Sequence, residues 1–398
     1  MRRSIGILAL NNNNDVLDEI TDVRPLGAVP FGGRYRLLDF PLSCMVNAGL
    51  RNVGIITPYH YRPLLDHLGA GKAWSLDRKE DGLFILPGGN QGLRPRQWHF
   101  PLRDLHRSIE FLDKSSSDDV IFSEANFIAN IDLVKAREYH CSKDLDVTLI
   151  YTSETPTCGD AHSLLRLNLT RGQKVTGWCE YDEKEERLVT DGIKGTKSVA
   201  GKKGAPRATG SKKAPTYYVG MGIIKRQLLQ DVIGSSPFAI NMDLFDILGE
   251  NLDTLKVGAF EHEGFFGNIS SVLTYFCNNM ALLDPNISQE LFTLNNPIHT
   301  KIMDNPPTRY RYQAMVSNSF ISSGSLIDGM IESSVISREV QVKEKAEVRN
   351  CIVMHKTQIG KNAKLENVIL DKYVKVNDNV VLRGKPDDPV IIGKYSVI

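Results

Sequence analysis

Short apolar runs, each bounded by polar or glycine-containing stretches, recur through the first 285 residues of the chain. The run at residues 4–10 is typical of a strand that is buried on both faces of a sheet. Further strands are predicted at residues 53–57, 84–87, 144–151 and 217–224 and at a run that ends within 119–126, and helices at 62–68, 107–112 and 272–283. This alternation of strands and helices predicts an α/β domain.

The hydrophobic period changes at about residue 317. Apolar residues then recur at roughly six-residue spacing among Gly, Asn and Asp, and residues 359–364 form a clear hexapeptide unit. The repeating apolar positions are Ile327, Ile331, Val335, Val340, Val342, Ala346, Val348, Ile352, Ile359, Ala363, Leu365, Val374, Val376 and Leu382. Such repeats stack into a parallel β-helix in which each coil buries the apolar face of its neighbour. We therefore predict an α/β domain at 1–285, a linker at 286–316 and a β-helix domain at 317–398, whose open edge at 390–392 favours oligomers.

Composition and charge narrow the class of protein. The 398 residues carry 48 Lys and Arg against 47 Asp and Glu, so nothing in the overall charge indicates nucleic acid or a membrane surface. No apolar run reaches the roughly 20 residues that span a bilayer, and the N-terminus lacks a signal-peptide core. The six cysteines show no C-x-x-C spacing, which argues against a zinc site or disulfide framework. We expect a cytoplasmic protein with no membrane and no nucleic-acid partner.

Residues 27–43 contain the most informative stretch of candidate chemistry. Gly32 and Gly33 allow a tight turn and a close approach to a partner group. Arg34 and Arg36 follow at alternate positions, so in an extended segment both side chains leave on the same side. A pair of guanidinium groups suits a phosphate or a carboxylate, although two solvated arginines beside a turn would give the same pattern.

The stretch Ala-Val-Pro-Phe-Gly-Gly-Arg-Tyr-Arg-Leu-Leu-Asp-Phe-Pro-Leu-Ser at 28–43 also resembles the signature of bacterial ADP-glucose pyrophosphorylase (glucose-1-phosphate adenylyltransferase). The resemblance continues at 69–78, at 219–222 and in the C-terminal repeat. It implies a Rossmann-like nucleotidyltransferase (nucleotide-diphospho-sugar transferase) domain followed by a left-handed parallel β-helix. It also implies a remnant sugar and nucleotide pocket formed by Trp74, Asp77, Arg78, Glu180, Gly220, Met221 and Gly222. Taken alone, a Trp beside an Asp-Arg pair is more often a packed corner than a sugar platform.

This chain differs from the family that it resembles at several positions where the family has phosphate-binding groups. The glycine-rich loop after the first strand is replaced by four asparagines and an aspartate at 11–15. The two lysine positions are Leu26 and Tyr181, and a G-T-A loop that meets the nucleotide base falls near the bulky residues 100–102. Between 194 and 215 the chain is rich in Lys, Gly, Ser and Ala with no acid, which is typical of a surface loop and leaves anion binding or partner docking as an alternative.

The family that this chain resembles binds magnesium through two carboxylates. At the two aligned positions this chain has no carboxylate. When the sequences are aligned on Ser123, the first carboxylate position is occupied by Ala125. In an alternative alignment Glu124 supplies the carboxylate one residue earlier. Because side chains alternate along a strand, Glu124 would then point to the opposite face of the sheet. The second is Asn268, which offers a carbonyl oxygen without charge. We therefore predict no catalytic residue, the degenerate positions being Leu26, Ala125, Tyr181 and Asn268, and no metal or other cofactor bound by this chain; Mg²⁺ is expected for a catalytic partner.

The sequence thus predicts a regulatory subunit without catalysis of its own, similar to the D-type subunit that some Gram-positive bacteria pair with a catalytic ADP-glucose pyrophosphorylase subunit in glycogen biosynthesis. The expected assembly is a hetero-oligomer, taken to be a tetramer. By the same resemblance, Arg34 and Arg36 lie near a site for a sugar-phosphate effector at the junction with the β-helix. The rival hypotheses are an active adenylyltransferase that uses Glu124, a free-standing sugar-nucleotide sensor or scaffold, and a hexapeptide acyltransferase, for which His355 is the one histidine in the repeat.

Overall fold

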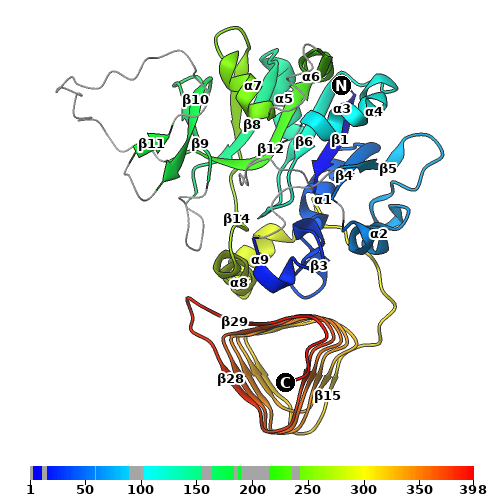
Figure 1. Ribbon diagram of the computed structural model, residues 1–398, viewed down its shortest axis with the longest axis vertical. Coiled ribbons are helices and arrows are strands. Elements are labelled where there is room, and N and C mark those ends of the chain that lie inside the picture. Colours follow the sequence, from blue (N-terminus) through cyan, green and yellow to red (C-terminus); the bar gives the residue numbers. More distant parts are fainter. Residues whose placement is uncertain are drawn as a thin grey trace, which may run out of the picture.

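The computed structural model describes residues 3–10, 16–58, 60–88, 100, 102–154, 164–182, 187–189, 215–234 and 243–398; at 180–182 and 187–189 it describes the backbone alone. These residues form a nucleotidyltransferase-like α/β domain and a C-terminal left-handed β-helix (Figure 1). In Figure 1 the β-helix appears as a triangular prism below the α/β domain. The predicted fold class is confirmed.

A mixed sheet forms the centre of the α/β domain. One half is parallel and consists of β5 (Gly82–Pro87), β4 (Asn52–Thr57), β1 (Ser4–Ala9) and β6 (Asp119–Ser123). Strand β12 (Tyr217–Lys225) runs antiparallel to β6 and joins this half to the remaining strands, which are β8 (Val147–Thr152), β13 (Val257–Glu261), β9 (Arg166–Leu169), β10 (Val175–Asp182) and β11 (Arg187–Val189).

Both faces of this sheet are buried, as the apolar run of β1 predicts. Ile5, Ile7 and Ala9 belong to one hydrophobic cluster, whereas Leu8 and Leu10 belong to another, because successive side chains point to opposite faces. The first face is covered by α3 (Leu102–Arg107), α4 (Ile109–Asp113), α6 (Arg226–Gly234) and α7 (Leu244–Glu250). The second is covered by α1 (Asp39–Asn47), α2 (Arg62–Leu68) and α5 (Leu133–Ser142).

Short elements near the β-helix position the sites described below. A hairpin joins β2 (Pro30–Phe31) to β3 (Tyr35–Arg36), and its turn contains Gly32 and Gly33 at φ values of 54° and 77°. Other short elements are η1 (Asp18–Ile20), η2 (Leu26–Ala28), η3 (Lys72–Trp74), the antiparallel pair β7 (Phe127–Ala129) and β14 (Phe266–Asn268), and helices α8 (Val272–Ala281) and α9 (Pro285–Leu291).

Three parallel sheets form the walls of the β-helix. The first contains β15 (Arg309–Tyr310), β18 (Leu326–Ile327), β21 (Gln341–Val342), β24 (Gln358–Ile359) and β27 (Lys375–Val376). The second contains β16 (Met315–Ser317), β19 (Met330–Glu332), β22 (Glu347–Arg349), β25 (Lys364–Glu366) and β28 (Val381–Arg383). The third contains β17 (Phe320–Ile321), β20 (Val335–Ile336), β23 (Ile352–Val353), β26 (Val368–Leu370) and β29 (Val390–Ile392). The stacking begins at Arg309, before the predicted start at 317, and helix α9 lies within the predicted linker.

The repeating apolar residues fill the interior of the prism, and polar residues turn its corners. Asn350, Asn362 and Asn367 adopt positive φ values of 50°, 54° and 52°. Asparagine tolerates this left-handed conformation better than most residues with a side chain. These three asparagines, which interrupt the apolar period, therefore mark corners between the strands.

An apolar layer attaches the β-helix to the α/β domain. It combines residues of η2, the hairpin and α8 with Ile352, Met354 and Ile369 of the β-helix. Within this layer Arg24 forms two hydrogen bonds of 2.8 Å with the carboxylate of Asp371, and both side chains are almost fully buried. The two domains are thus joined by apolar packing and by the buried Arg24–Asp371 ion pair. Among the described residues, none of the helices combines the length and apolar character that crossing a membrane requires.

Candidate functional site

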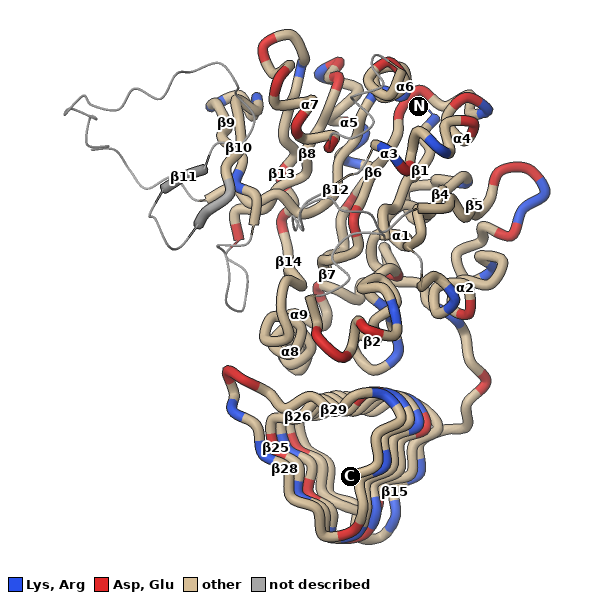
Figure 2. The backbone as a smooth tube through the Cα atoms, in the orientation of Figure 1, with Lys and Arg blue, Asp and Glu red and all other residues tan. Residues whose placement is uncertain are grey.

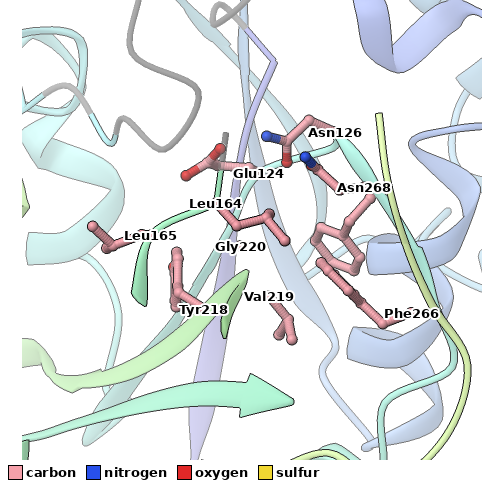
Figure 3. Close-up of a pocket in the computed structure, with 10 residues that line it drawn as sticks. Glu124, Asn126, Leu164, Leu165, Tyr218, Val219, Gly220, Phe266 and Asn268 are labelled. Atoms are coloured by element: carbon pink, nitrogen blue, oxygen red, sulfur yellow. The ribbon is translucent and has the colours of Figure 1, made fainter. Parts of the chain in front are cut away.

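The described residues line two small spaces at the strand end where the resemblance places nucleotide and metal. Beyond the end of β6, Glu124, Ala125 and Asn126 are all buried. Glu124 and Asn126 line a pocket with Gly220 and Asn268 that encloses only about 10 Å³, roughly the room for one water molecule. In Figure 3 the amides of Asn126 and Asn268 point toward one another, whereas the Glu124 carboxylate points away from them.

Two of the altered positions are built into apolar surroundings. Leu26 is 3% exposed and belongs to the apolar layer between the domains. Ala125 belongs to the cluster beneath the sheet together with Leu10, and both residues line a second space of about 10 Å³ with Gly27 and Glu124. A lysine ammonium at position 26 or an aspartate carboxylate at position 125 would lose its hydration in these apolar surroundings without gaining a charged or hydrogen-bonding partner.

The carboxylates available at this strand end are few. Asn268 of β14 pairs with Phe127 of β7, and its backbone carbonyl accepts a hydrogen bond of 3.0 Å from the side-chain amide of Asn278. Glu124 is the one carboxylate among the described residues that line the two small spaces. It lines both spaces and follows directly on Ser123, the last residue of β6. Among the described residues, no group of three His, Cys, Asp or Glu side chains is arranged to hold a metal ion.

The predicted sugar-pocket residues lie in three places. Gly220 lines the strand-end pocket, and an added Cβ there would meet the Phe127 ring at 2.9 Å. Met221 and Gly222 lie within β12, paired with β6. Trp74 is buried against His67, with ring centroids 5.7 Å apart, while Asp77 and Arg78 are exposed on the surface.

Some predicted positions lie outside the described residues. These are the loop at 11–15, the side chains of Glu180 and Tyr181, Pro101 and, apart from Pro215, the basic loop at 194–215. The neighbouring Phe100 is buried and packs against Phe122 at a centroid distance of 5.3 Å.

A much larger cavity, of about 640 Å³, opens between the two domains. We call it the interdomain pocket. Its lining residues are Val23, Arg24, Pro30, Gly33, Arg34, Tyr35, Arg36, Arg62, Pro63, Asp66, His67, Lys301, Met303, Ser337, Arg338, His355, Lys372, Tyr373, Lys394 and Tyr395. Eight of these are Arg or Lys, against one Asp. Figure 2 shows Lys and Arg both on the coils of the β-helix and on the facing part of the α/β domain.

The α/β domain contributes its cations mainly through the hairpin. Arg34 and Arg36 both line the interdomain pocket, as their alternate spacing in an extended segment predicts. Gly33 allows the hairpin to approach the β-helix closely, because a Cβ there would meet the Ser322 hydroxyl oxygen at 2.7 Å. Arg36 is held by a hydrogen bond of 2.6 Å from its guanidinium to the Pro63 carbonyl of α2.

The β-helix contributes a second set of cations along one corner. Arg338, His355 and Lys372 occupy equivalent positions on three successive coils, since each precedes a paired strand of the first sheet by the same number of residues. On the next turn the Lys394 ammonium lies 4.6 Å from the centroid of the Tyr395 ring. The aromatic ring restrains this lysine through a cation–π contact while its charge stays at the pocket.

Arg24 is paired with Asp371, but five other cations of the interdomain pocket lack an acidic partner in the described part of the chain. Among the described residues, Arg34, Arg36, Arg338, Lys372 and Lys394 have no carboxylate within the 4.0 Å limit for an ion pair. Burial, and then the nearby Arg24, lower the pKa of the Arg36 guanidinium to about 10 against the opposing effect of Asp39. Burial, followed by Arg36 and Arg24, lowers the pKa of the Lys372 ammonium to about 6. A polyanion would relieve this concentration of positive charge.

Sequence reasoning identified only the hairpin half of this pocket. Arg338, Lys372 and Lys394 lie in repeats whose pattern indicates a structural role. A signal was nevertheless present, because a basic residue recurs at the same place in successive coils. Its meaning depended on knowing which corner of the β-helix faces the hairpin.

Comparison with known proteins agrees with both halves of the architecture. Residues 16–86 match the family model described as nucleotidyl transferase, and residues 302–387 match the one described as GlmU-like, C-terminal hexapeptide. The chain is 29% identical over 394 residues to the glycogen biosynthesis protein GlgD of Bacillus subtilis, covering 99% of this chain and 96% of that protein. It is 27% identical over 400 residues to the glucose-1-phosphate adenylyltransferases of Bacillus mycoides and Bacillus cereus, covering 99% of this chain and 98% of each enzyme.

Over nearly its whole length the chain is similar to a glycogen biosynthesis protein and to glucose-1-phosphate adenylyltransferases. Similarity to its relatives spans the α/β domain, the linker and the β-helix. The altered strand end and the interdomain pocket therefore occur in a chain that has both an α/β domain and a β-helix.

Proposed function

We propose that this chain is a regulatory, catalytically degenerate subunit of ADP-glucose pyrophosphorylase. It acts in the cytoplasm in glycogen biosynthesis, assembled as a hetero-oligomer, expected to be a tetramer, with a catalytic subunit that makes ADP-glucose from ATP and glucose 1-phosphate. The names of its relatives, a glycogen biosynthesis protein and glucose-1-phosphate adenylyltransferases, support this role. The observation that carries the proposal is the burial of Ala125 and Leu26 in apolar clusters at the strand end.

Nucleotidyl transfer requires phosphate charge to be neutralised while the reactants are held in line. Loss of one preorganised electrostatic group typically lowers a rate by about 10²–10³-fold. Leu26, Ala125 and Asn268 offer neither a cation nor an anionic metal ligand, so their combined effect exceeds that of a single loss. Mg²⁺ is accordingly assigned to the catalytic partner.

The first test is an assay of the purified chain alone with ATP, glucose 1-phosphate and Mg²⁺. We expect pyrophosphate release at the level of a sample without protein. Robust release would contradict the proposed loss of catalysis.

An active adenylyltransferase that uses Glu124 is a second candidate, because this carboxylate lines both small spaces at the strand end. Comparing wild type with E124Q separates the two candidates. If Glu124 carries catalysis, any release by the chain alone falls by about 10²-fold or more in E124Q. If the chain is regulatory, E124Q and wild type give the same background.

The interdomain pocket is proposed as the site for a sugar-phosphate effector, with Arg34 and Arg36 among its ligands. We expect the R34A/R36A variant to assemble with the catalytic subunit but to alter or abolish the effector response of the mixed enzyme. The control is R349A/R383A, which removes two partly exposed arginines whose carboxylate partners lie on the β-helix surface. The measurements are activity as this chain is titrated into the catalytic subunit, and the size of the complex.

An unchanged effector response in R34A/R36A would remove both arginines from the site. A free-standing scaffold predicts instead that the chain neither joins the catalytic subunit nor changes its activity.

A further inference from the structure

Lys372 occupies a distinctive place in the interdomain pocket. It follows Asp371 on a coil of the β-helix, but both oxygens of that carboxylate accept hydrogen bonds from the Arg24 guanidinium at 2.8 Å. The Asp371 carboxylate also accepts a bond of 2.6 Å from the Lys372 backbone N–H, not from its ammonium. Among the described residues, the ammonium has no carboxylate within 4.0 Å.

The groups that face Lys372 are mostly basic on every side. The neighbouring elements supply Arg24 from the segment before η2, Arg36 from β3, His67 from α2, His355 from the preceding coil, Lys394 from the following turn, and Asp371 from its own coil. Burial and like charges both disfavour the charged form of an amine. The two histidines are themselves held toward their neutral forms, because burial lowers the pKa of each imidazole.

We propose that Lys372 is neutral while the interdomain pocket holds no anion and takes up a proton from solvent when a doubly charged anion binds. This inference rests on the proposed function of the pocket and specifies how its effector is sensed. The lone pair of the amine accepts the proton, and the new ammonium then lies beside the bound anion. Binding is therefore coupled to pH through one residue of the β-helix.

The coupling has a defined direction. Below about pH 6 the lysine is charged before the anion arrives, so affinity there is insensitive to its titration. Above that pH, each site binds one more proton in the complex than in the free protein. Affinity for a fixed dianion then falls by about tenfold per pH unit until the lysine in the complex also loses its proton.

The test is isothermal titration calorimetry of the full chain with inorganic sulfate, which stays fully ionised near neutral pH, and with a sugar bisphosphate. At pH 7.5, titrations in two buffers of different ionisation enthalpy report the protons taken up per site. We expect close to one proton for wild type with sulfate. We expect none for K372R, whose guanidinium is charged throughout, together with an affinity that depends little on pH.

Two further variants make the outcome specific. K372M should bind more weakly and take up no proton, because it removes the amine without adding a charge. K375R changes an exposed lysine of the same coil and should behave as wild type. Near-UV and far-UV circular dichroism of each variant checks that the fold is kept.

The outcomes separate the inference from the function on which it rests. Sulfate binding without proton uptake in wild type, or undiminished uptake in K372R, overturns the role of Lys372 and leaves the pocket as an anion site. If neither sulfate nor the sugar bisphosphate binds, both the anion site in the interdomain pocket and the inference about Lys372 are overturned.

Discussion

Gly33 has a left-handed backbone conformation at a position where there is no room for a side chain. Its φ is +77°, and an added Cβ would meet the Ser322 hydroxyl oxygen at 2.7 Å and the Ile336 carbonyl oxygen at 3.1 Å. A side chain there would strain the turn and push the hairpin away from the β-helix. Because Arg34 and Arg36 follow directly, the position of the pocket's hairpin cations depends on this glycine.

We expect G33A to lower the free energy of unfolding by about 3 kcal/mol, because left-handed backbone strain adds to overpacking. G49A is the matched control: φ is +82°, but nothing lies within 4 Å of the added Cβ. It should cost only about 1–2 kcal/mol. Urea unfolding measures both, and equal losses would show that the hairpin does not press on the β-helix.

At the scale of an element, the corners of the β-helix depend on residues that accept left-handed backbone. Asn362 is exposed at φ 54°, and its amide donates a hydrogen bond of 3.0 Å to Asn379 on the next coil. The apolar interior specifies stacking, but these corners let each coil close into a triangle. The polar interruptions in the repeat are therefore as informative as its apolar positions.

We expect N362V to destabilise the protein by about 1–2 kcal/mol, because a β-branched side chain is poorly tolerated at positive φ. N362G relieves the backbone strain while losing the amide contact, so its cost should stay below about 1 kcal/mol. Thermal and urea unfolding of the two variants provide the comparison. A larger loss for glycine than for valine would mean that the amide ladder, not the backbone, governs this corner.

At the scale of the whole molecule, the Arg24–Asp371 ion pair joins segments that lie 347 residues apart in the sequence. Arg24 lies two residues before η2, which carries Leu26 and Gly27 to the strand end. Asp371 directly precedes Lys372 of the interdomain pocket. The ion pair therefore lies between the strand end, where catalysis is proposed to be lost, and the interdomain pocket, where an effector is proposed to bind. It also fixes how the β-helix sits on the α/β domain.

We expect either R24M or D371N to lower the free energy of unfolding by about 3–5 kcal/mol, because each leaves a buried polar or charged partner uncompensated. The double variant should cost less than the sum of the two singles. A double-mutant cycle by urea unfolding measures this coupling. Additive losses would mean that the pair contributes little beyond its separate side chains.

Much of the architecture follows from sequence pattern alone. The apolar run of β1, the hexapeptide period and the Gly-Gly turn each predict a local element from nearby residues, and those elements are present. Boundaries were less certain: the β-helix begins at Arg309, and the region predicted as one helix at 107–112 spans the end of α3 and most of α4. The strand-alternation argument against Glu124 stays a prediction, because β6 ends at Ser123, one residue before it.

The sequence by itself determined the two-domain fold and the altered residues at the strand end, since both are written in local pattern and residue type. Only the tertiary structure decided that Lys372 and Arg338 of the β-helix face Arg36 of the hairpin across one cavity. Which corner of a repeating prism meets the α/β domain is set by apolar packing and the Arg24–Asp371 pair, contacts between residues hundreds of positions apart. A periodic pattern specifies how coils stack but carries no information about the surface against which they dock.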